Sequence, residues 1–362
     1  MVSAGSLLYF AASAQGAAGA AIWRSDGSAG GTWPVRTDVT LWSDGVQPLA
    51  VLGERVLFSG EDAENREAEL WISDGSAAGT TLVHRIGRTY AGSEPDWLTA
   101  VGDWVYFAAT DQDGGRELWR SNGSADATQR VADIVPGSGD ANPYRLAAHH
   151  GELFFVATDG SSGYELWRSD GTAAGTVRTA DIHAGPRDAY PSALTSTAGY
   201  LFFAANDGST GAEPWRTDGL ANGTQRPVDI VPGPSERLPA PFAGVPGFGL
   251  NAYRQLVPMH AGVADYAAPT EFVDVGDGRV AFRGCDAEAG CQVWTSDGTA
   301  VGTHRLTTLE AGPGGAAPGH LTVLGDTLYF AANESSSGRE LWKILLPERV
   351  VEVFHDGFEA RN

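Results

Sequence analysis

Three carboxylates lie close together in the loop sequence TDQDGGRE, at Asp111, Asp113 and Glu117. Calcium takes several oxygen ligands, and an Asp-x-Asp-Gly run with a later glutamate resembles part of a calcium loop. The twelve-residue spacing of an EF-hand is absent. The alternative is an Asp-Gly turn whose glutamate accepts hydrogen bonds from loop amides. Calcium is therefore the one cofactor that the sequence suggests, and a purely structural turn remains open beside it.

Histidine and arginine side chains could supply a base, a metal ligand or an anion-binding group. His183, Arg187 and His260 fall in segments that also contain many loop residues. Imidazole titrates near neutral pH and is the commonest metal ligand, but scattered histidines are more often structural. The chain contains no HExxH, GxSxG or phosphate-loop motif. We therefore expect no catalytic residue, although a close cluster of His183 or His260 with Arg187 and a carboxylate would favour an enzyme.

Aromatic residues follow three of the Gly- and Pro-rich connections, at Trp97, Tyr144 and Tyr190. An exposed ring offers an apolar face with polar edges around it, which suits a sugar ring. The alternative is that these rings wedge neighbouring elements of the fold together. They are candidate ligand-binding residues together with His183 and Arg187.

One connection is much longer than the others, at about residues 233–264. It is rich in Pro and Gly and contains Tyr253, Arg254 and His260. Loops of this length are uncommon unless they are functional or disordered, and the apolar content argues against full disorder. We expect this segment to fold over a ligand site and to contribute those three side chains, with a packing role as the alternative.

The two cysteines are Cys285 and Cys291, in FRGCDAEAGCQVW. Facing positions on a hairpin can meet the geometry of a disulfide, and a disulfide implies an oxidising compartment. Two cysteines alone make an incomplete zinc site. The sequence therefore predicts a disulfide and a secreted, periplasmic or cell-surface protein. The start MVSAGSLLYF lacks the basic end and long apolar segment of a signal peptide, as expected for a trimmed chain.

These residues are carried by a repeat whose tryptophans recur every 48 residues, with one step of 79 that is 31 residues longer. The tryptophans that mark the repeat are Trp23, Trp71, Trp119, Trp167, Trp215, Trp294 and Trp342. Each unit reads as an apolar segment, an aromatic run such as LFFAA, a polar loop, ELWRSDG or a variant, and a last apolar segment. Gly, Asp, Asn and Pro separate these pieces, which indicates four short strands in each unit.

Seven units of four strands predict an all-β fold, a seven-bladed β-propeller of four-stranded antiparallel blades. A straight solenoid would need polar capping repeats, and neither end of the chain reads as one. We expect a single domain over residues 1–362, interrupted by the long connection. VEVFHD, after Trp342, is predicted to supply the outermost strand of the last blade, and the first strand of the first blade should be short.

The repeat resembles the ELWxxDGT-repeat proteins, a group of bacterial repeat proteins. The resemblance covers nearly the whole chain and is strongest at ELWISDGSAAGT, ELWRSDGTAAGT and VWTSDGTAVGT. It is weaker in the first, third and fifth units, and the last unit has lost the DGT part. The resemblance implies a propeller-like fold and an exported protein. It implies no particular activity and assigns no catalytic residue.

The charge and composition of the chain limit its partners. The formal net charge of −21 repels phosphate backbones and anionic lipid heads, so nucleic acid is not an expected partner. No apolar run of eighteen residues predicts a membrane span. We expect a non-catalytic binding module, a monomer whose loop-rich face takes a glycan or a protein. The alternatives are a polysaccharide lyase or hydrolase and a purely structural surface repeat.

Overall fold

The fold is described from a computed structural model of the 362-residue chain. The described residues are 1–13, 19–41, 49–62, 67–87, 92–111, 113, 115–220, 222–230, 269–286, 288–309, 316–334, 338–346 and 354–355. They contain strands and turns and no helix, and no helix within them could span a membrane. The chain divides into two compact units, Met1–Arg178 and Thr179–Asn362. Each unit is described by itself.

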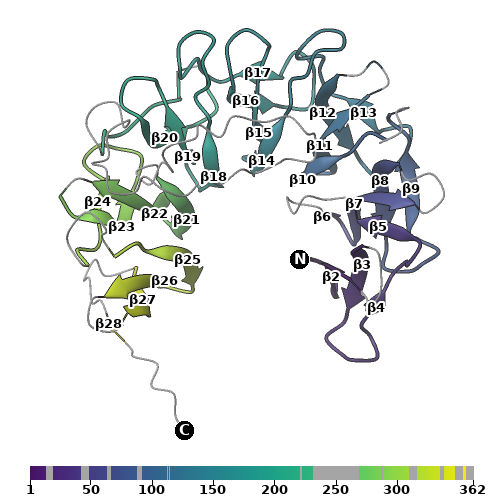
Figure 1. Ribbon diagram of the computed structural model, residues 1–362, viewed down its shortest axis with the longest axis horizontal. Coiled ribbons are helices and arrows are strands. Elements are labelled where there is room, and N and C mark those ends of the chain that lie inside the picture. The colour runs from purple at the N-terminus through teal and green to yellow at the C-terminus, as the bar shows by residue number, and fades with distance from the viewer. Residues whose placement is uncertain are drawn as a thin grey trace, which may run out of the picture. The chain divides into compact units, whose positions relative to one another are not determined.

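The first unit contains four antiparallel sheets, here called blades 1 to 4 (Figure 1). Blade 1 consists of β1 (Val2–Ala4), β2 (Leu7–Ala12), β3 (Ala21–Ser25) and β4 (Trp33–Pro34). Blade 2 consists of β5 (Val39–Leu41), β6 (Leu49–Leu52), β7 (Arg55–Asp62), β8 (Ala68–Ser73) and β9 (Thr81–His84). Blade 3 consists of β10 (Asp96–Val101), β11 (Trp104–Thr110), β12 (Arg116–Ser121) and β13 (Gln129–Arg130). Blade 4 consists of β14 (Tyr144–His149), β15 (Glu152–Ala157), β16 (Glu165–Ser169) and β17 (Val177–Arg178).

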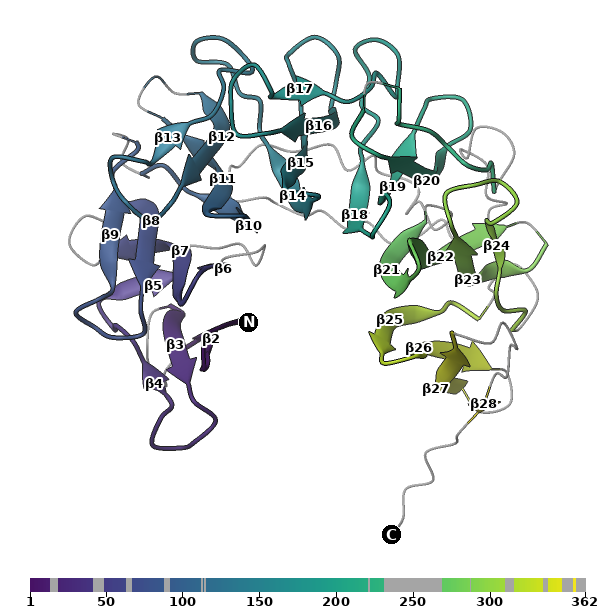
Figure 2. The same cartoon turned by 180° about the vertical axis from the view of Figure 1, so that it is seen from behind.

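The second unit contains blades 5 to 7 (Figure 2). Blade 5 consists of β18 (Ser192–Ser196), β19 (Leu201–Asn206) and β20 (Ala212–Thr217). Blade 6 consists of β21 (Thr270–Gly276), β22 (Arg279–Asp286), β23 (Gly290–Ser296) and β24 (His304–Arg305). Blade 7 consists of β25 (Gly319–Leu324), β26 (Thr327–Glu334), β27 (Gly338–Leu345) and β28 (Phe354–His355). In both units the innermost strand of a blade contacts that of the next, as in β10 with β14 and β21 with β25.

The prediction of four strands in every blade is right for five blades and wrong for two. Blade 2 has a fifth strand: β6 pairs with the first half of β7, and β5 pairs with Gly60–Asp62 at its end. Blade 5 has three strands, and its outermost strand is reduced to one bridge between Arg216 and Gln225. The predicted strand from the end of the chain is present, since β28 pairs with β27. The first strand, β1, has three residues and is short, as predicted. The single-domain organisation over residues 1–362 stays a prediction.

The repeated tryptophan lies directly opposite a phenylalanine of the second strand in all seven blades. The pairs are Phe10 with Trp23, Phe58 with Trp71, Phe107 with Trp119, Phe155 with Trp167, Phe203 with Trp215, Phe282 with Trp294 and Phe330 with Trp342. Neighbouring residues of a strand point to opposite faces of the sheet. Leu166 and Trp167 are both buried, so both faces of blade 4 are covered. The hydrophobic clusters accordingly lie between successive blades rather than inside one.

The turn SDGTAAGT after β16 shows why the repeat keeps its polar residues. Asp170 accepts hydrogen bonds from the Thr172 amide at 2.8 Å and from the Thr172 hydroxyl at 2.7 Å. The Gly175 amide donates to that hydroxyl oxygen at 3.0 Å. Thr176 donates to the Thr172 carbonyl and shares a hydrogen bond with Ser169. Each polar side chain of the motif therefore has a partner inside the turn.

The glycine of this turn is required by its backbone angle and, in most blades, by the blade before it. Gly171 has φ +91°, and a Cβ atom built there would lie 2.5 Å from the Tyr106 hydroxyl of blade 3. Tyr106 is buried and cannot easily move. Gly27, at the same position in blade 1, also has φ +91°, but nothing lies within 4 Å of its Cβ position. The turn thus contacts blade 3 closely at Gly171, whereas a Cβ atom at Gly27 would meet no described atom.

We predict that Gly171→Ala lowers the free energy of unfolding more than Gly27→Ala does. Both substitutions force a side chain into the left-handed region, at a cost of about 1–2 kcal/mol. Only Gly171→Ala also overpacks the contact with Tyr106, which adds about 1–3 kcal/mol. Urea unfolding of the two variants measures the difference. Equal losses would show that the turn glycine does not fix the distance between blades.

Candidate functional site

The innermost strands of blades 3 to 7 share a β-bulge where the strand begins. The bulge residues are non-glycine residues in the left-handed region, with φ between +54° and +60°: Trp97, Arg145, Ala193, Glu271 and His320. The register shifts at this point in each of these strands. A bulge re-aims the side chain that it carries. Because five blades share this bulge, its backbone strain is a property of the fold, and only the side chain at the bulge differs from blade to blade.

Threonine hydroxyls fix the bulges and link neighbouring blades. The Thr99 hydroxyl lies 3.1 Å from the Trp97 carbonyl and 3.3 Å from the Leu146 carbonyl of the next blade. In the second unit the Thr195 hydroxyl lies in the same way between the carbonyls of Ala193 and Phe272. The bulge side chains of the first unit are thereby held at defined positions beside each other.

Blades 3 and 4 bring three aromatic rings and an arginine together, which we call the aromatic cluster: Trp97, Tyr144, Arg145 and Tyr164. The Tyr144 ring lies edge to face with Trp97 at 6.2 Å between centroids and with Tyr164 at 5.6 Å. The Arg145 guanidinium lies 5.5 Å from the centre of the Tyr144 ring. All four residues are partly exposed, and Trp97 also packs on the core between the two blades.

The three aromatic residues singled out from the sequence do not occupy equivalent positions. Trp97 is a bulge residue, Tyr144 stands one position before its bulge, and Tyr190 stands three positions before Ala193. Trp97 and Tyr144 lie together, which fits both the platform and the wedge expected from the sequence. Tyr190, in the second unit, is 53% exposed. Sequence reasoning missed Tyr164 and Arg145, whose only signal is their place beside the two aromatics.

His183 and Arg187 lie in the connection that leads to β18. The His183 ring donates from Nδ1 to the Asp188 carbonyl at 3.2 Å, and its Nε2 side faces the backbone of Gly208. Arg187 is exposed. The ring is thus packed against its own blade. Tyr253, Arg254 and His260, with the whole connection at about 233–264, lie outside the described residues.

The side-chain oxygens of two of the three predicted calcium ligands, Asp111 and Glu117, have protein partners. Arg130 contacts the Asp111 carboxylate at 3.0 Å, and the second Asp111 oxygen accepts a hydrogen bond from the Asp113 amide. Both Glu117 oxygens accept backbone amides at 3.0 Å, from Ile134 and Val135. Within the described residues no group of three or more His, Cys, Asp or Glu side chains is placed to hold a metal ion. Calcium binding in this loop stays a prediction.

The glutamate of ELW is a buried anchor for the segment that follows the fourth strand. Glu117 is fully buried, and burial raises its pKa to about 7 although two amides donate to it. Glu213 accepts the Ile230 amide in the same way. Blade 6 has Gln292 at this position, where the amide oxygen accepts from Leu309 and Thr307. A neutral side chain therefore fits the site that glutamate occupies elsewhere.

The predicted disulfide is present between Cys285 and Cys291. The two residues face each other across the hairpin of β22 and β23, and no described cysteine is free.

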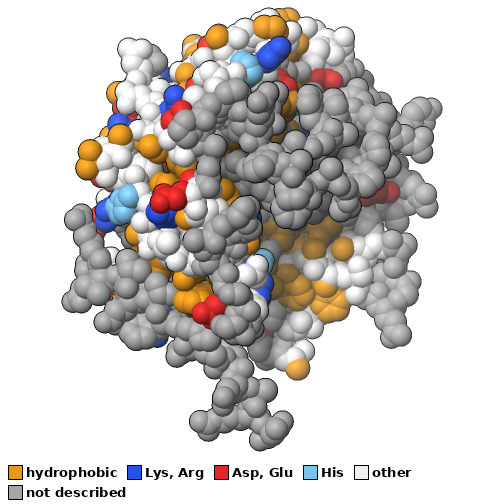
Figure 3. All heavy atoms as spheres, turned by 60° about the vertical axis from the view of Figure 1, so that its left-hand side comes forward, with side chains coloured by type: hydrophobic (Ala, Val, Ile, Leu, Met, Phe, Trp, Pro, Cys, Tyr) orange, Lys and Arg blue, Asp and Glu red, His pale blue; other side chains and the backbone are white. Residues whose placement is uncertain are grey.

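Figure 3 shows both positively and negatively charged side chains among the described residues of the face in view.

No protein-family model matches the chain, and no curated protein matches it either. Among solved structures, a puromycin hydrolase is similar at 14% identity and a TM-score of 0.52, over 95% of this chain and 51% of that one. A puromycin-hydrolyzing peptidase of Mycobacterium tuberculosis is similar at 13% identity and a TM-score of 0.51, over 93% of this chain and 50% of that one. A prolyl endopeptidase is similar at 12% identity and a TM-score of 0.50, over 98% of this chain and 48% of that one.

These likenesses concern the fold alone, because the identities are low. The chain spans about half the length of the solved chains, and the neighbours are β-propeller domains of prolyl oligopeptidase-type proteins. Together with the seven antiparallel sheets, they confirm the predicted all-β propeller fold.

We predict that Glu117→Gln removes part of the pH dependence of stability. Glu117 has a pKa of about 7 in the folded protein and 4.5 as its ordinary value. Below pH 4.5 the side chain is protonated in both the folded and the unfolded protein, so its burial does not lower the free energy of unfolding. The free energy of unfolding of the wild type therefore falls as pH rises from about 4.5 to 7. The expected fall is about 2–3 kcal/mol. Urea unfolding across this range should give a flatter curve for the variant. Parallel curves would contradict the raised pKa.

If the Asp-Gly turn, the alternative to a calcium loop, is right, calcium should leave the midpoint of thermal unfolding unchanged, because Arg130 and three amides already hold the oxygens of Asp111 and Glu117. An ion bound to the folded state alone must raise that midpoint. Melting curves with calcium and then with a chelator test this. A rise that the chelator reverses would support the calcium site expected from the sequence.

Proposed function

We propose that the protein is an exported, non-catalytic binding propeller, whose aromatic cluster at the start of β10 and β14 takes a glycan. The observation that supports this most is the set of three aromatic rings in contact, all partly exposed, with Trp97 in β10, Tyr144 in β14 and Tyr164 just before β16. Aromatic rings pack well on the apolar faces of sugars, and Arg145 adds donors for hydroxyl groups.

The backbone around the cluster favours recognition because it is held in place before any ligand arrives. Thr99 ties the bulge of β10 to β14, and Tyr144 is flanked by a ring on each side. Side chains that are already ordered lose little conformational entropy on binding. The net charge of −21 disfavours polyanionic ligands, so a neutral glycan fits better than an acidic one.

An enzyme is the less supported function. Three of the titratable groups that the sequence offered are engaged in the scaffold: Glu117 with two amides, Asp111 with Arg130, and His183 with the Asp188 carbonyl. The peptidase activities of the structural neighbours belong to chains about twice as long. The disulfide supports export, because such bonds persist in oxidising compartments. The likeness of the repeat to ELWxxDGT proteins stays part of this proposal.

We predict that the protein binds a neutral polysaccharide and that Tyr144→Ala or Tyr164→Ala weakens binding about tenfold. An aromatic contact is worth about 0.5–1.5 kcal/mol, and 1.4 kcal/mol is tenfold in affinity. A glycan array followed by calorimetry with the best ligand gives the comparison. Tyr144→Phe should bind like the wild type, because the ring remains.

Trp33→Ala is the matched control, since Trp33 is a partly exposed ring beside an arginine, Arg24, in blade 1. It should leave binding unchanged. Equal losses in Trp33→Ala and Tyr144→Ala, or no glycan bound at all, would contradict the proposal. Capture of a protein that the Tyr144→Ala variant fails to capture would favour a protein ligand instead.

A further inference from the structure

Blade 5 departs from the repeat in the turn between its third strand and its reduced fourth strand. Five of the six such turns that keep the Asp/Asn-Gly pair have Ser or Thr after the glycine, whereas this one reads TDGLANGT with Leu220 there. In the turn of blade 4 that hydroxyl donates to the Asp170 carboxylate. Asp218 accepts only the Leu220 amide, at 2.9 Å, among the hydrogen bonds of the described residues. The carboxylate therefore keeps accepting capacity that the other turns use internally.

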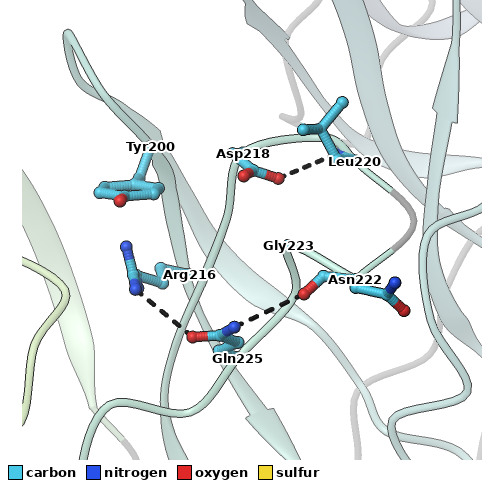
Figure 4. A pocket seen from close by; sticks show the side chains of 7 residues that line it. All are labelled: Tyr200, Arg216, Asp218, Leu220, Asn222, Gly223 and Gln225. Atoms are coloured by element: carbon cyan, nitrogen blue, oxygen red, sulfur yellow. Dashed lines mark hydrogen bonds between the residues drawn. The ribbon is translucent and has the colours of Figure 1, made fainter.

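A cavity of about 430 Å³ lies against this turn, lined by Tyr200, Arg216, Asp218, Leu220, Asn222, Gly223 and Gln225 (Figure 4). Its size falls in the range of about 300–1,000 Å³ that is usual for small-molecule sites. The Leu220 side chain is 66% exposed at its rim. The site therefore combines an apolar contact with the carboxylate of Asp218 and the amides of Asn222 and Gln225.

The wall of the cavity is ordered by contacts within blade 5. The Arg216 guanidinium lies 4.0 Å from the centre of the Tyr200 ring. Its Nη2 atom lies 3.4 Å from the Gln225 side-chain oxygen, and the Gln225 amide group lies 3.5 Å from the Asn222 carbonyl. Gly298 of blade 6 packs against the Arg216 stem. The Arg216 Nε atom is buried without a partner among the described residues.

We propose that this cavity binds one unit of a neutral saccharide. Vicinal hydroxyl groups donate to Asp218 and accept from the Asn222 and Gln225 amides, and the C–H face of the sugar lies on Leu220. The negative charge of Asp218 and the positive charge of Arg216 balance locally, which favours a neutral ligand over an anionic one. This site is formed by residues other than the aromatic cluster, so it goes beyond the proposed function and does not depend on it.

The proposal can be tested by giving the turn of blade 5 the residues that the turn of blade 4 already has, since that sequence forms the same kind of turn. Leu220→Thr, Asn222→Ala and Gln225→Val together give blade 5 the residues that blade 4 has at Thr172, Ala174 and Val177. The introduced threonine hydroxyl should donate a hydrogen bond to Asp218, as the Thr172 hydroxyl donates to Asp170. The triple variant should therefore fold with an unchanged or higher melting temperature.

The probes are the neutral disaccharides lactose, cellobiose and maltose, with glucuronic acid as the anionic comparison. Amide shifts of Gly223 and Gln225 in the NMR spectrum report on this site alone, and the indole signal of Trp97 reports on the aromatic cluster. We expect a neutral disaccharide to shift the blade 5 amides of the wild type, with affinity at least tenfold weaker in the triple variant. Tyr144→Ala should leave these shifts unchanged.

Three results would overturn the proposal. They are the absence of any blade 5 shift with all three disaccharides, equal affinity in the wild type and a folded triple variant, and preference for glucuronic acid. If the disaccharides shift the blade 5 amides but not the indole signal of Trp97, the result would contradict the proposed function and support this inference.

Discussion

Close approach between a turn and the preceding blade sets the spacing of these sheets. At Gly171 the turn leaves no room for a Cβ atom beside Tyr106, and at Gly75 a Cβ atom would lie 2.6 Å from the Tyr9 hydroxyl. These positions require glycine for two separate reasons, the positive φ and the short contact. Because the turn lies at a fixed distance from the neighbouring blade, the apolar faces of the two sheets meet and bury their Phe–Trp pairs.

The polar residues of the repeat complete this scaffold. Asp170, Thr172 and Thr176 satisfy one another within the turn, and the buried Glu117 holds the segment after the fourth strand. Hydrogen bonds from the Ser or Thr two residues later lower the pKa of Asp26 and Asp170, mainly through its hydroxyl, and that of Asp74, mainly through its backbone amide, which keeps these exposed carboxylates charged down to acid pH. A residue that repeats in every blade thus serves the fold. The two proposed binding sites lie where one blade differs from the others, at Trp97 and at Leu220.

Much of this fold can be predicted from the sequence because it depends on residues that are close to one another in the chain. The tryptophan spacing gives the seven sheets, the Asp-Gly pairs give the turns, and the facing cysteines give the disulfide. The extra strand β5 forms by pairing with the end of β7, and the fourth strand of blade 5 is reduced to one bridge to β20; no local sequence pattern indicates either outcome. The bulges place Trp97, Tyr144 and Tyr190 at three different positions, although spacing alone makes them look alike. The ion pair that holds Asp111 comes from Arg130, nineteen residues later.

The central claim is that the side chains of the repeated turn satisfy its backbone amides, so that an exposed turn behaves as part of the core scaffold. Amide hydrogen exchange of Thr172 and Gly175 measures this directly, because their amides bond to Asp170 and to the Thr172 hydroxyl. Both amides should exchange much more slowly than in an unstructured peptide, with opening energies closer to those of the neighbouring strands than to those of mobile loops. Exchange at the rate of an unstructured peptide would mean that these residues are not engaged in the scaffold.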